Sequence, residues 1–339
     1  MTKISRRQRK QKPSHYNDNR RHPHGLEYEC TDTGNMQRFI DRNHEKARST
    51  GSPKEWLTWD GRRWSNTQYK SVFELALETV ESIKSEHKRC KNLEGKKRLL
   101  SWKERSESQA RLNAMVNMAS NNPTMVTQLS DYDRQIYYIN SKNGLVDLRT
   151  GELIDHNPKH NITKLANVSY HPKAECPTFD KFIQEVFNHD PELIRWMQRA
   201  IGYSLTGSVV EHCLFIAYGT GANGKSTLFE VISQILGDYS KTADFETFLN
   251  NQLSDVRSLE AVGELKGIRY ALASEVDKSR RFSESVVKRL TGGDTLRGTK
   301  LRSSAFEFKP EFKLWFLANH LPFARDGSYG FWRRIKVIP

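Results

Sequence analysis

The possible folds of this chain are limited above all by one glycine-rich loop, Gly219-Thr220-Gly221-Ala222-Asn223-Gly224-Lys225-Ser226. The loop satisfies the pattern GxxxxGK[ST], which typically cradles the phosphates of a nucleoside triphosphate. It follows an apolar run of buried-strand length, residues 214–218, and precedes an amphipathic helical pattern that begins at residue 225. Strand, loop and helix are the context that the motif requires, so we expect a triphosphate site here rather than a simple glycine-rich turn.

The chemistry of phosphate binding explains the spacing within the loop. Glycines let backbone N–H groups approach phosphates without an obstructing Cβ, and the amino end of the following helix adds a positive dipole. By the same pattern Lys225 would contact the β- and γ-phosphates, and the Ser226 hydroxyl would ligate Mg²⁺. The residues expected to bind nucleotide are Gly219, Thr220, Gly221, Ala222, Asn223, Gly224, Lys225, Ser226 and Thr227.

Two further apolar runs, residues 268–273 and 312–317, lead to polar residues that could complete such a site. Ligands of open α/β sheets bind at the carboxyl ends of the strands, where these side chains are expected. Glu275 could polarise the attacking water or hold Mg²⁺ through a water, with Asp277 as a second candidate; a solvated acid at a strand end is the simpler alternative. Asn319 could bond the γ-phosphate or the attacking water.

An arginine pair, Arg333-Arg334, precedes a fourth apolar run, residues 335–338. An arginine there could neutralise charge that develops on a transferred phosphoryl group. Taken alone, the pair is equally well interpreted as surface arginines at the end of a strand. The alternation of strands and helices from residue 206 onward predicts an α/β fold whose largely parallel sheet is covered by helices.

The region before residue 206 predicts mixed helices and strands. Asp60-Gly61 between alternating apolar residues indicates a hairpin, and residues 143–154 indicate another, with its turn near Thr150-Gly151. Apolar stripes predict helices over residues 67–90, from about residue 178, and from Pro191. A charge-dense stretch, residues 84–111, mixes Arg and Lys with glutamates, which favours an exposed helical surface over a binding stripe.

The charge balance favours a polyanionic partner, most simply nucleic acid. The chain has 54 Lys and Arg residues against 40 Asp and Glu residues, a net charge of +14. Residues 1–24 carry eight of these cations and one acid, and they hold too few apolar residues to fold. A solvated arm and a non-specific nucleic-acid arm both remain open for this tail.

Composition excludes several protein classes. The four cysteines are far apart and form no CxxC pair, so we expect neither a disulfide scaffold nor a zinc ribbon. The same pattern indicates a reducing compartment. No stretch approaches the roughly 18 apolar residues of a membrane span, and the amino terminus lacks the apolar core of a secretory signal.

Together the motifs resemble the superfamily 3 helicases, and within them the poxvirus-type primase–helicases of phages, plasmids and large DNA viruses. The resemblance spans about residues 90–339, and residues 31–64 resemble the stretch that links primase to helicase. Besides the phosphate loop it rests on Asn143-Gly144, Asp147-Leu148-Arg149-Thr150-Gly151, Cys176-Pro177, Gly202-Tyr203-Ser204-Leu205-Thr206-Gly207, Ala273-Ser274-Glu275, Leu290-Thr291-Gly292-Gly293-Asp294, Phe306-Glu307-Phe308-Lys309-Pro310, Asn319-His320 and Trp332-Arg333-Arg334.

The resemblance implies an AAA+-like core that binds ATP and Mg²⁺ and assembles as a hexameric ring on single-stranded DNA. It makes Lys225 and Ser226 the Walker A pair, Glu275 the Walker B acid and a metal ligand, and Asn319 sensor 1. Arg333 fits the arginine finger that reaches a neighbour's ATP, with Arg334 as the second choice.

The resemblance also implies a hairpin between Asp294 and Phe308 that projects into the channel of the ring. Its basic residues would contact phosphates, which positions a strand without reading its sequence. Two basic positions of the family fall on Thr299 and Ser303 here. The expected DNA-binding residues are Arg297, Lys300 and Arg302.

We therefore expect an AAA+-like P-loop NTPase core preceded by a mixed, mainly helical domain and a disordered basic tail. The expected segments are a tail over 1–26, a small linker-like module over 27–90, an α+β domain over 91–205, and an ATPase core over 206–339 that is incomplete at its carboxyl end.

The expected function is an ATP-dependent helicase subunit that moves on single-stranded DNA during replication of a phage, plasmid or other mobile element. It would act in the host cytoplasm, with a separate primase as a further partner. The alternative is an origin-recognition or helicase-loading module that assembles on DNA without unwinding it. A P-loop kinase is disfavoured because no acceptor-binding lid is evident.

Overall fold

The structure is a computed structural model that divides into two compact units. The first comprises residues 1–58 and 66–127, and the second comprises residues 59–65 and 128–339. Among the residues described, no helix combines the length and the apolar character that crossing a membrane requires. The described residues are 23–52, 54–66, 69–219, 223–243, 256–274, 283–299, 305–319 and 329–339.

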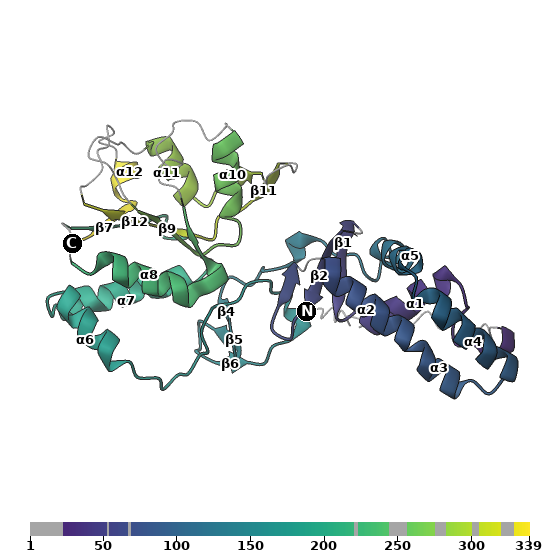
Figure 1. The fold of residues 1–339 in the computed structure, drawn as a ribbon. Coiled ribbons are helices and arrows are strands. Elements are labelled where there is room, and N and C mark those ends of the chain that lie inside the picture. Colours follow the sequence, from purple (N-terminus) through teal and green to yellow (C-terminus); the bar gives the residue numbers. More distant parts are fainter. Residues whose placement is uncertain are drawn as a thin grey trace, which may run out of the picture. The chain divides into compact units, whose positions relative to one another are not determined.

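The first unit is a helical bundle with a small sheet (Figure 1). Its core gathers Phe39, Trp56, Leu99, Trp102 and Met115, all nearly inaccessible to solvent. Strand β1 pairs antiparallel with β2, and the sheet order is β1-β2-β3. The elements are η1 (Pro23–Gly25), α1 (Asp32–Asn43), β1 (Ala47–Ser52), β2 (Glu55–Trp59), α2 (Tyr69–Glu81), α3 (Ile83–Arg89), α4 (Leu93–Ser106) and α5 (Gln109–Ser120); β3 (Trp64–Asn66) begins in residues 59–65, which belong to the second unit.

The helix predicted over residues 67–90 is two helices, so that prediction is wrong in its continuity. The break between α2 and α3 falls at Ser82, whose hydroxyl donates to the carbonyl of Thr79 at 2.6 Å. Such a local side-chain bond competes with the helical backbone pattern. The hairpin predicted at Asp60-Gly61 is present, because the Asp60 carboxylate accepts from the backbone N–H groups of Arg62 and Arg63, both at 2.8 Å.

The division into units differs from the expected domain borders at residues 90 and 205. Helices α4 and α5 share one apolar cluster with α1 and α2, so residues 91–127 belong with the module before them. Residues 23–26, expected in the tail, are ordered against that module: Leu26 packs on its core, and His24 lies 3.4 Å from Glu94. Residues 1–22 lie outside the described part of the chain.

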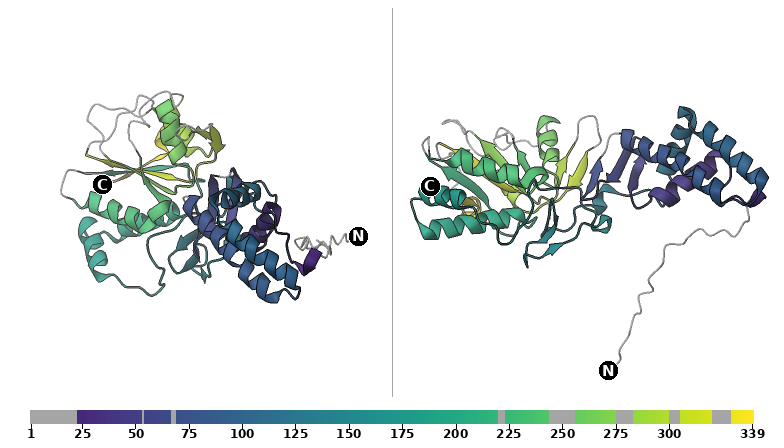
Figure 2. Two further views of the ribbon diagram at one scale, coloured as in Figure 1. Left: turned by 45° about the vertical axis from the view of Figure 1, so that its right-hand side comes forward. Right: turned by 60° about the horizontal axis from the view of Figure 1, so that its bottom comes forward.

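The second unit contains a parallel sheet of five described strands in the order β13-β7-β12-β9-β8. Helices α7 and α8 cover one face, and α10 and α11 the other (Figures 1 and 2). Apolar clusters fill both interfaces, and Phe215 stacks on Trp315 with ring centroids 4.2 Å apart. The expected parallel α/β sheet is therefore confirmed. The strands are β7 (Leu214–Tyr218), β8 (Ser240–Thr242), β9 (Tyr270–Ser274), β12 (Lys313–Ala318) and β13 (Ile335–Ile338).

The helices of this unit begin near the residues that the sequence indicates. Asp190 caps α7 by accepting from the backbone N–H of Glu192 at 2.9 Å and of Leu193 at 3.1 Å. An antiparallel sheet, β4-β5-β6, precedes them, and Thr150-Gly151 lies in its β5–β6 connection as predicted. These elements are β4 (Tyr138–Ser141), β5 (Gly144–Asp147), β6 (Leu153–Ile154), α6 (Pro177–Val186), α7 (Pro191–Leu205), α8 (Lys225–Leu236), α10 (Val256–Glu264), α11 (Glu284–Thr291) and α12 (Tyr329–Trp332), with short turns η2 (Leu129–Asp131), η3 (Pro158–His160) and η4 (Gly237–Tyr239).

Two buried cations attach the segments before β7 to the amino ends of the central strands. Arg269 donates to the carbonyls of Tyr138 at 2.6 Å and Leu205 at 2.8 Å. The Lys313 ammonium donates to the carbonyls of Ser208 and Glu311, both at 3.1 Å. Burial lowers the pKa of Lys313 to about 7. The bonds to Tyr138, Leu205 and Ser208 thus join segments far apart in the sequence to the starts of β9 and β12 within the second unit.

The expected hairpin between Asp294 and Phe308 is present as strands β10 (Leu296–Gly298) and β11 (Phe306–Phe308), which pair antiparallel. Its first strand lies against α10 at a close backbone contact. A Cβ on Gly298 would lie 2.5 Å from Cα of Gly263, and a Cβ on Gly263 would lie 2.2 Å from the carbonyl oxygen of Thr299. Two glycines are therefore needed where the hairpin meets the helix.

Alanine at Gly263 is expected to destabilise the second unit by about 1–3 kcal/mol, since the added methyl group meets a backbone oxygen. That oxygen cannot easily move, because the same residue, Thr299, donates its N–H to Leu259 at 3.0 Å. The matched control is Gly202→Ala in α7, where a Cβ meets nothing within 4 Å; it should stabilise by about 0.5–1 kcal/mol. Urea unfolding measures both, and equal shifts would contradict the close contact.

Candidate nucleotide site

The glycine-rich loop connects the carboxyl end of β7 to the first residue of α8, as predicted. Gly219 directly follows β7 and donates its N–H to the carbonyl of Ala318, at the end of β12, at 3.2 Å. Gly224 has φ +76°, and a Cβ there would lie 2.7 Å from Cγ2 of Val186. Only glycine adopts this positive φ readily and also lacks the Cβ that would clash with Val186. This fits a loop whose backbone approaches phosphates closely. Thr220, Gly221 and Ala222 lie outside the described residues.

Lys225 is folded back over the start of the loop. Its ammonium donates to the carbonyl of Gly219 and to Oδ1 of Asn223 at 3.1 Å. Partial burial lowers the pKa of Lys225. Ser226 and Thr227 are exposed in the first turn of α8, which contains no acidic residue. A cation and the uncompensated amino end of a helix thus lie together, an arrangement suited to an anion.

The strand register brings Asn319 beside this loop. Ala318 pairs with Tyr218, so the exposed Asn319 follows the sheet edge next to Gly219. On the other side of β12, Ser274 ends β9 opposite Leu317. Glu275, which comes next, and Asp277 lie outside the described residues. No group of three His, Cys, Asp or Glu side chains in the described ranges could hold a metal ion, so the magnesium assignment to Ser226 and Glu275 stays a prediction.

The two arginines lie at the amino ends of the strands, whereas the loop lies at their carboxyl ends. The backbone carbonyl of Arg334 accepts from the N–H of Leu214 at 2.8 Å, and Ile335 pairs with Leu214 at the amino end of β7. At about 3.3 Å per residue, β7 separates this end from the loop by roughly 16 Å. Arg333 is exposed. Burial lowers the pKa of Arg334, whose Nε and Nη1 have no hydrogen-bond partner among the described residues.

The predicted DNA-binding residues are only partly within the described structure. Arg297 is exposed on β10, where it pairs in register with the exposed Glu307 of β11. Lys300 and Arg302 lie outside the described residues. An acid opposite Arg297 lowers the local positive charge at the base of the hairpin.

Family comparison gives two matches that together cover most of the chain. Residues 36–188 match the family described as D5 N terminal like, and residues 217–334 match a family of unknown function (DUF5906). The second match includes the glycine-rich loop, Asn319 and both arginines.

Individual relatives come from large DNA viruses. A "putative helicase" of Acanthamoeba polyphaga mimivirus is 31% identical over 215 residues, which are 62% of this chain and 22% of the relative. A "putative primase" of African swine fever virus (isolate Tick/Malawi/Lil 20-1/1983) is 22% identical over 200 residues, 57% of this chain and 21% of the relative. The matches support a primase–helicase family. The chain spans about a fifth of the length of these relatives.

A solved structure also matches part of the chain. The C-terminal region of NrS-1 is 16% identical, with a TM-score of 0.38, over 49% of this chain and 38% of that chain.

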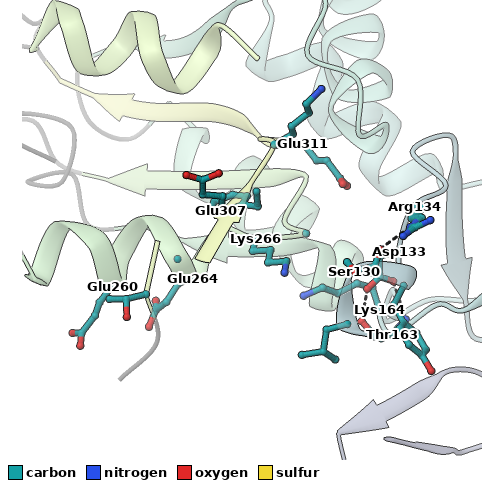
Figure 3. Close-up of a pocket in the computed structure, with 17 residues that line it drawn as sticks. Ser130, Asp133, Arg134, Thr163, Lys164, Glu260, Glu264, Lys266, Glu307 and Glu311 are labelled. Atoms are coloured by element: carbon teal, nitrogen blue, oxygen red, sulfur yellow. Dashed lines mark hydrogen bonds between the residues drawn. The ribbon is translucent and has the colours of Figure 1, made fainter. Parts of the chain in front are cut away.

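The structure also contains a cavity that the sequence did not reveal. Its volume is about 810 Å³, and it lies at the amino ends of β9 and β12, away from the glycine-rich loop. Figure 3 shows Glu260 and Glu264 on one side and Asp133, Thr163 and Lys164 on the other. Because its walls come from several distant segments, no local pattern could have predicted it.

Proposed function

We propose that this chain is the helicase portion of a superfamily 3 replication protein, which couples ATP hydrolysis to movement along single-stranded DNA. The observation that carries the proposal is the GxxxxGKS loop between β7 and α8, at the carboxyl edge of a parallel sheet and next to Asn319. The names of the viral relatives, helicase and primase, support a role in DNA replication.

Within one chain the proposed roles belong to residues at that edge. The Lys225 ammonium would neutralise the β- and γ-phosphates, and the Ser226 hydroxyl would hold Mg²⁺. Glu275 would activate water, and Asn319 would orient it against the γ-phosphate.

Arg333 would act from a neighbouring copy in a hexameric ring. It lies near the amino end of β7, and that strand places the loop of the same chain roughly 16 Å away. Action on the ATP of the same chain is therefore unfavourable. An arginine supplied by a neighbour would couple hydrolysis to the assembly of the ring. Arg297, Lys300 and Arg302 would then contact the phosphates of the strand in the channel.

A forked DNA duplex tests this function directly. We expect ATP-dependent release of the displaced strand, and ATP hydrolysis that single-stranded DNA stimulates. A non-hydrolysable ATP analogue should give no release. Hydrolysis without strand release would favour the alternative, a loading or origin-binding module, and absence of both would contradict an ATP-driven function.

A further inference from the structure

Helix α3, the turn after it and the first turns of α4 together concentrate positive charge in the first unit. Residues 84–98 contain seven Lys and Arg residues and two glutamates. Both glutamates are already engaged: Glu86 is buried and binds Arg38 through two bonds of 2.8 Å. Glu94 lies 3.4 Å from both Arg98 and His24. The acids of this segment therefore do not neutralise its remaining cations.

Two further cations of the segment have partners outside it. The Lys84 ammonium lies 2.6 Å from the carboxylate of Glu81, and Arg89 donates to Glu27 through two bonds of 2.7 Å. The four lysines that remain, which we name the basic cluster, have no ion pair among the residues described; three are exposed and Lys96 is half-buried. The basic cluster is Lys88, Lys91, Lys96 and Lys97.

The amino-terminal segment joins the structure beside this cluster. The turn η1 lies against the start of α4 (Figures 1 and 2), where a Cβ on Gly95 would lie 2.6 Å from the carbonyl oxygen of His24. The Cys90 thiol, at the end of α3, lies 3.9 Å from the same oxygen. Residues 1–22, with eight cations and one acid, therefore continue from a point next to the basic cluster.

We propose that the basic cluster binds the phosphate backbone of duplex DNA without reading its sequence. Lysine binds phosphate as a point charge, and duplex DNA presents one negative charge about every 1.7 Å. Residues 83–98 contain no Phe, Tyr or Trp, so they offer no platform for stacking the bases of a single strand. The basic cluster belongs to the first unit, whereas the nucleotide loop and the β10–β11 hairpin belong to the second, and the proposed contact requires no ATP.

The test is fluorescence anisotropy of a labelled 20-base-pair duplex, without nucleotide, over a range of salt concentrations. The variant replaces all four lysines of the basic cluster with glutamine and leaves residues 1–22 intact. We expect the affinity at low salt to fall roughly 10- to 100-fold, and the slope of log affinity against log salt to fall by roughly 3–4, about 0.9 per lost phosphate contact.

The matched control removes the same charge from scattered exposed lysines that have no ion pair among the described residues. They are Lys46, Lys142, Lys159 and Lys173. Urea unfolding establishes that both variants are folded, and their ATP hydrolysis is measured separately, so failure of the helicase proposal leaves this test intact. The proposal is overturned if the control variant loses as much affinity for the duplex as the cluster variant does, or if the cluster variant keeps its affinity for the duplex. It is also overturned if the cluster variant loses as much affinity for a single strand as for the duplex, or loses affinity only for anionic vesicles.

Discussion

Replacing Lys225 with alanine is expected to lower the rate of ATP hydrolysis by on the order of 10²–10³-fold, the effect of removing one fixed charge from a transition state. The ammonium has its contacts within the loop, at Gly219 and Asn223, so its removal should leave the parallel sheet intact. Phosphate release, measured with and without single-stranded DNA, gives the rate.

Two further variants isolate the cause. Lys225→Met keeps the aliphatic stem, so a loss as large as that of the alanine variant assigns the effect to the ammonium. Lys173→Ala removes an exposed lysine before α6 and should leave hydrolysis unchanged. If wild type and Lys225→Ala hydrolyse ATP at equal rates, the loop is not a catalytic phosphate site.

The central sheet could be predicted because its strands are buried on both faces. A continuous apolar run such as Leu214–Tyr218 is typical of a strand that is buried on both faces. The glycine-rich loop and Asn319 could be placed together for the same reason, since parallel strands deliver their carboxyl ends to one edge. Strand β8, Ser240–Thr242, was missed because it is short and polar, and its place beside β9 depends on partners far away in the sequence.

The first unit shows what the sequence could not reveal. The charge-dense residues 84–111 predict an exposed helical surface, yet Glu86 is only 5% exposed. Its partner, Arg38, lies 48 residues earlier, and no local pattern connects the two. Likewise the domain border expected at residue 90 fails because Leu99 and Trp102 complete the core that begins with Phe39. The position of Arg333, at the other end of the strands from the glycine-rich loop, also could not be predicted, because it depends on the register of β13 against β7.

The largest loss of stability is expected for Arg38→Met in that same buried pair. Arg38 is 1% exposed; its guanidinium bonds both oxygens of Glu86 at 2.8 Å and the carbonyl of Glu29 at 2.9 Å. Removing the cation leaves a buried carboxylate without its partner, which costs about 3–5 kcal/mol. Urea unfolding of the whole chain, followed by far-ultraviolet circular dichroism, should show an earlier transition of the first unit.

A second substitution separates the unpaired charge from lost packing. Adding Glu86→Leu to Arg38→Met removes both charges, and an apolar pair of similar volume often equals a buried ion pair in stability. Recovery should be partial, because the carbonyls of Tyr28 and Glu29 still lose the hydrogen bonds that the guanidinium donates. Arg42→Met, on the exposed side of the same helix, should change stability by less than about 0.5 kcal/mol. If Arg38→Met behaves like Arg42→Met, the pair does not stabilise the unit, since an uncompensated Glu86 would then carry no cost.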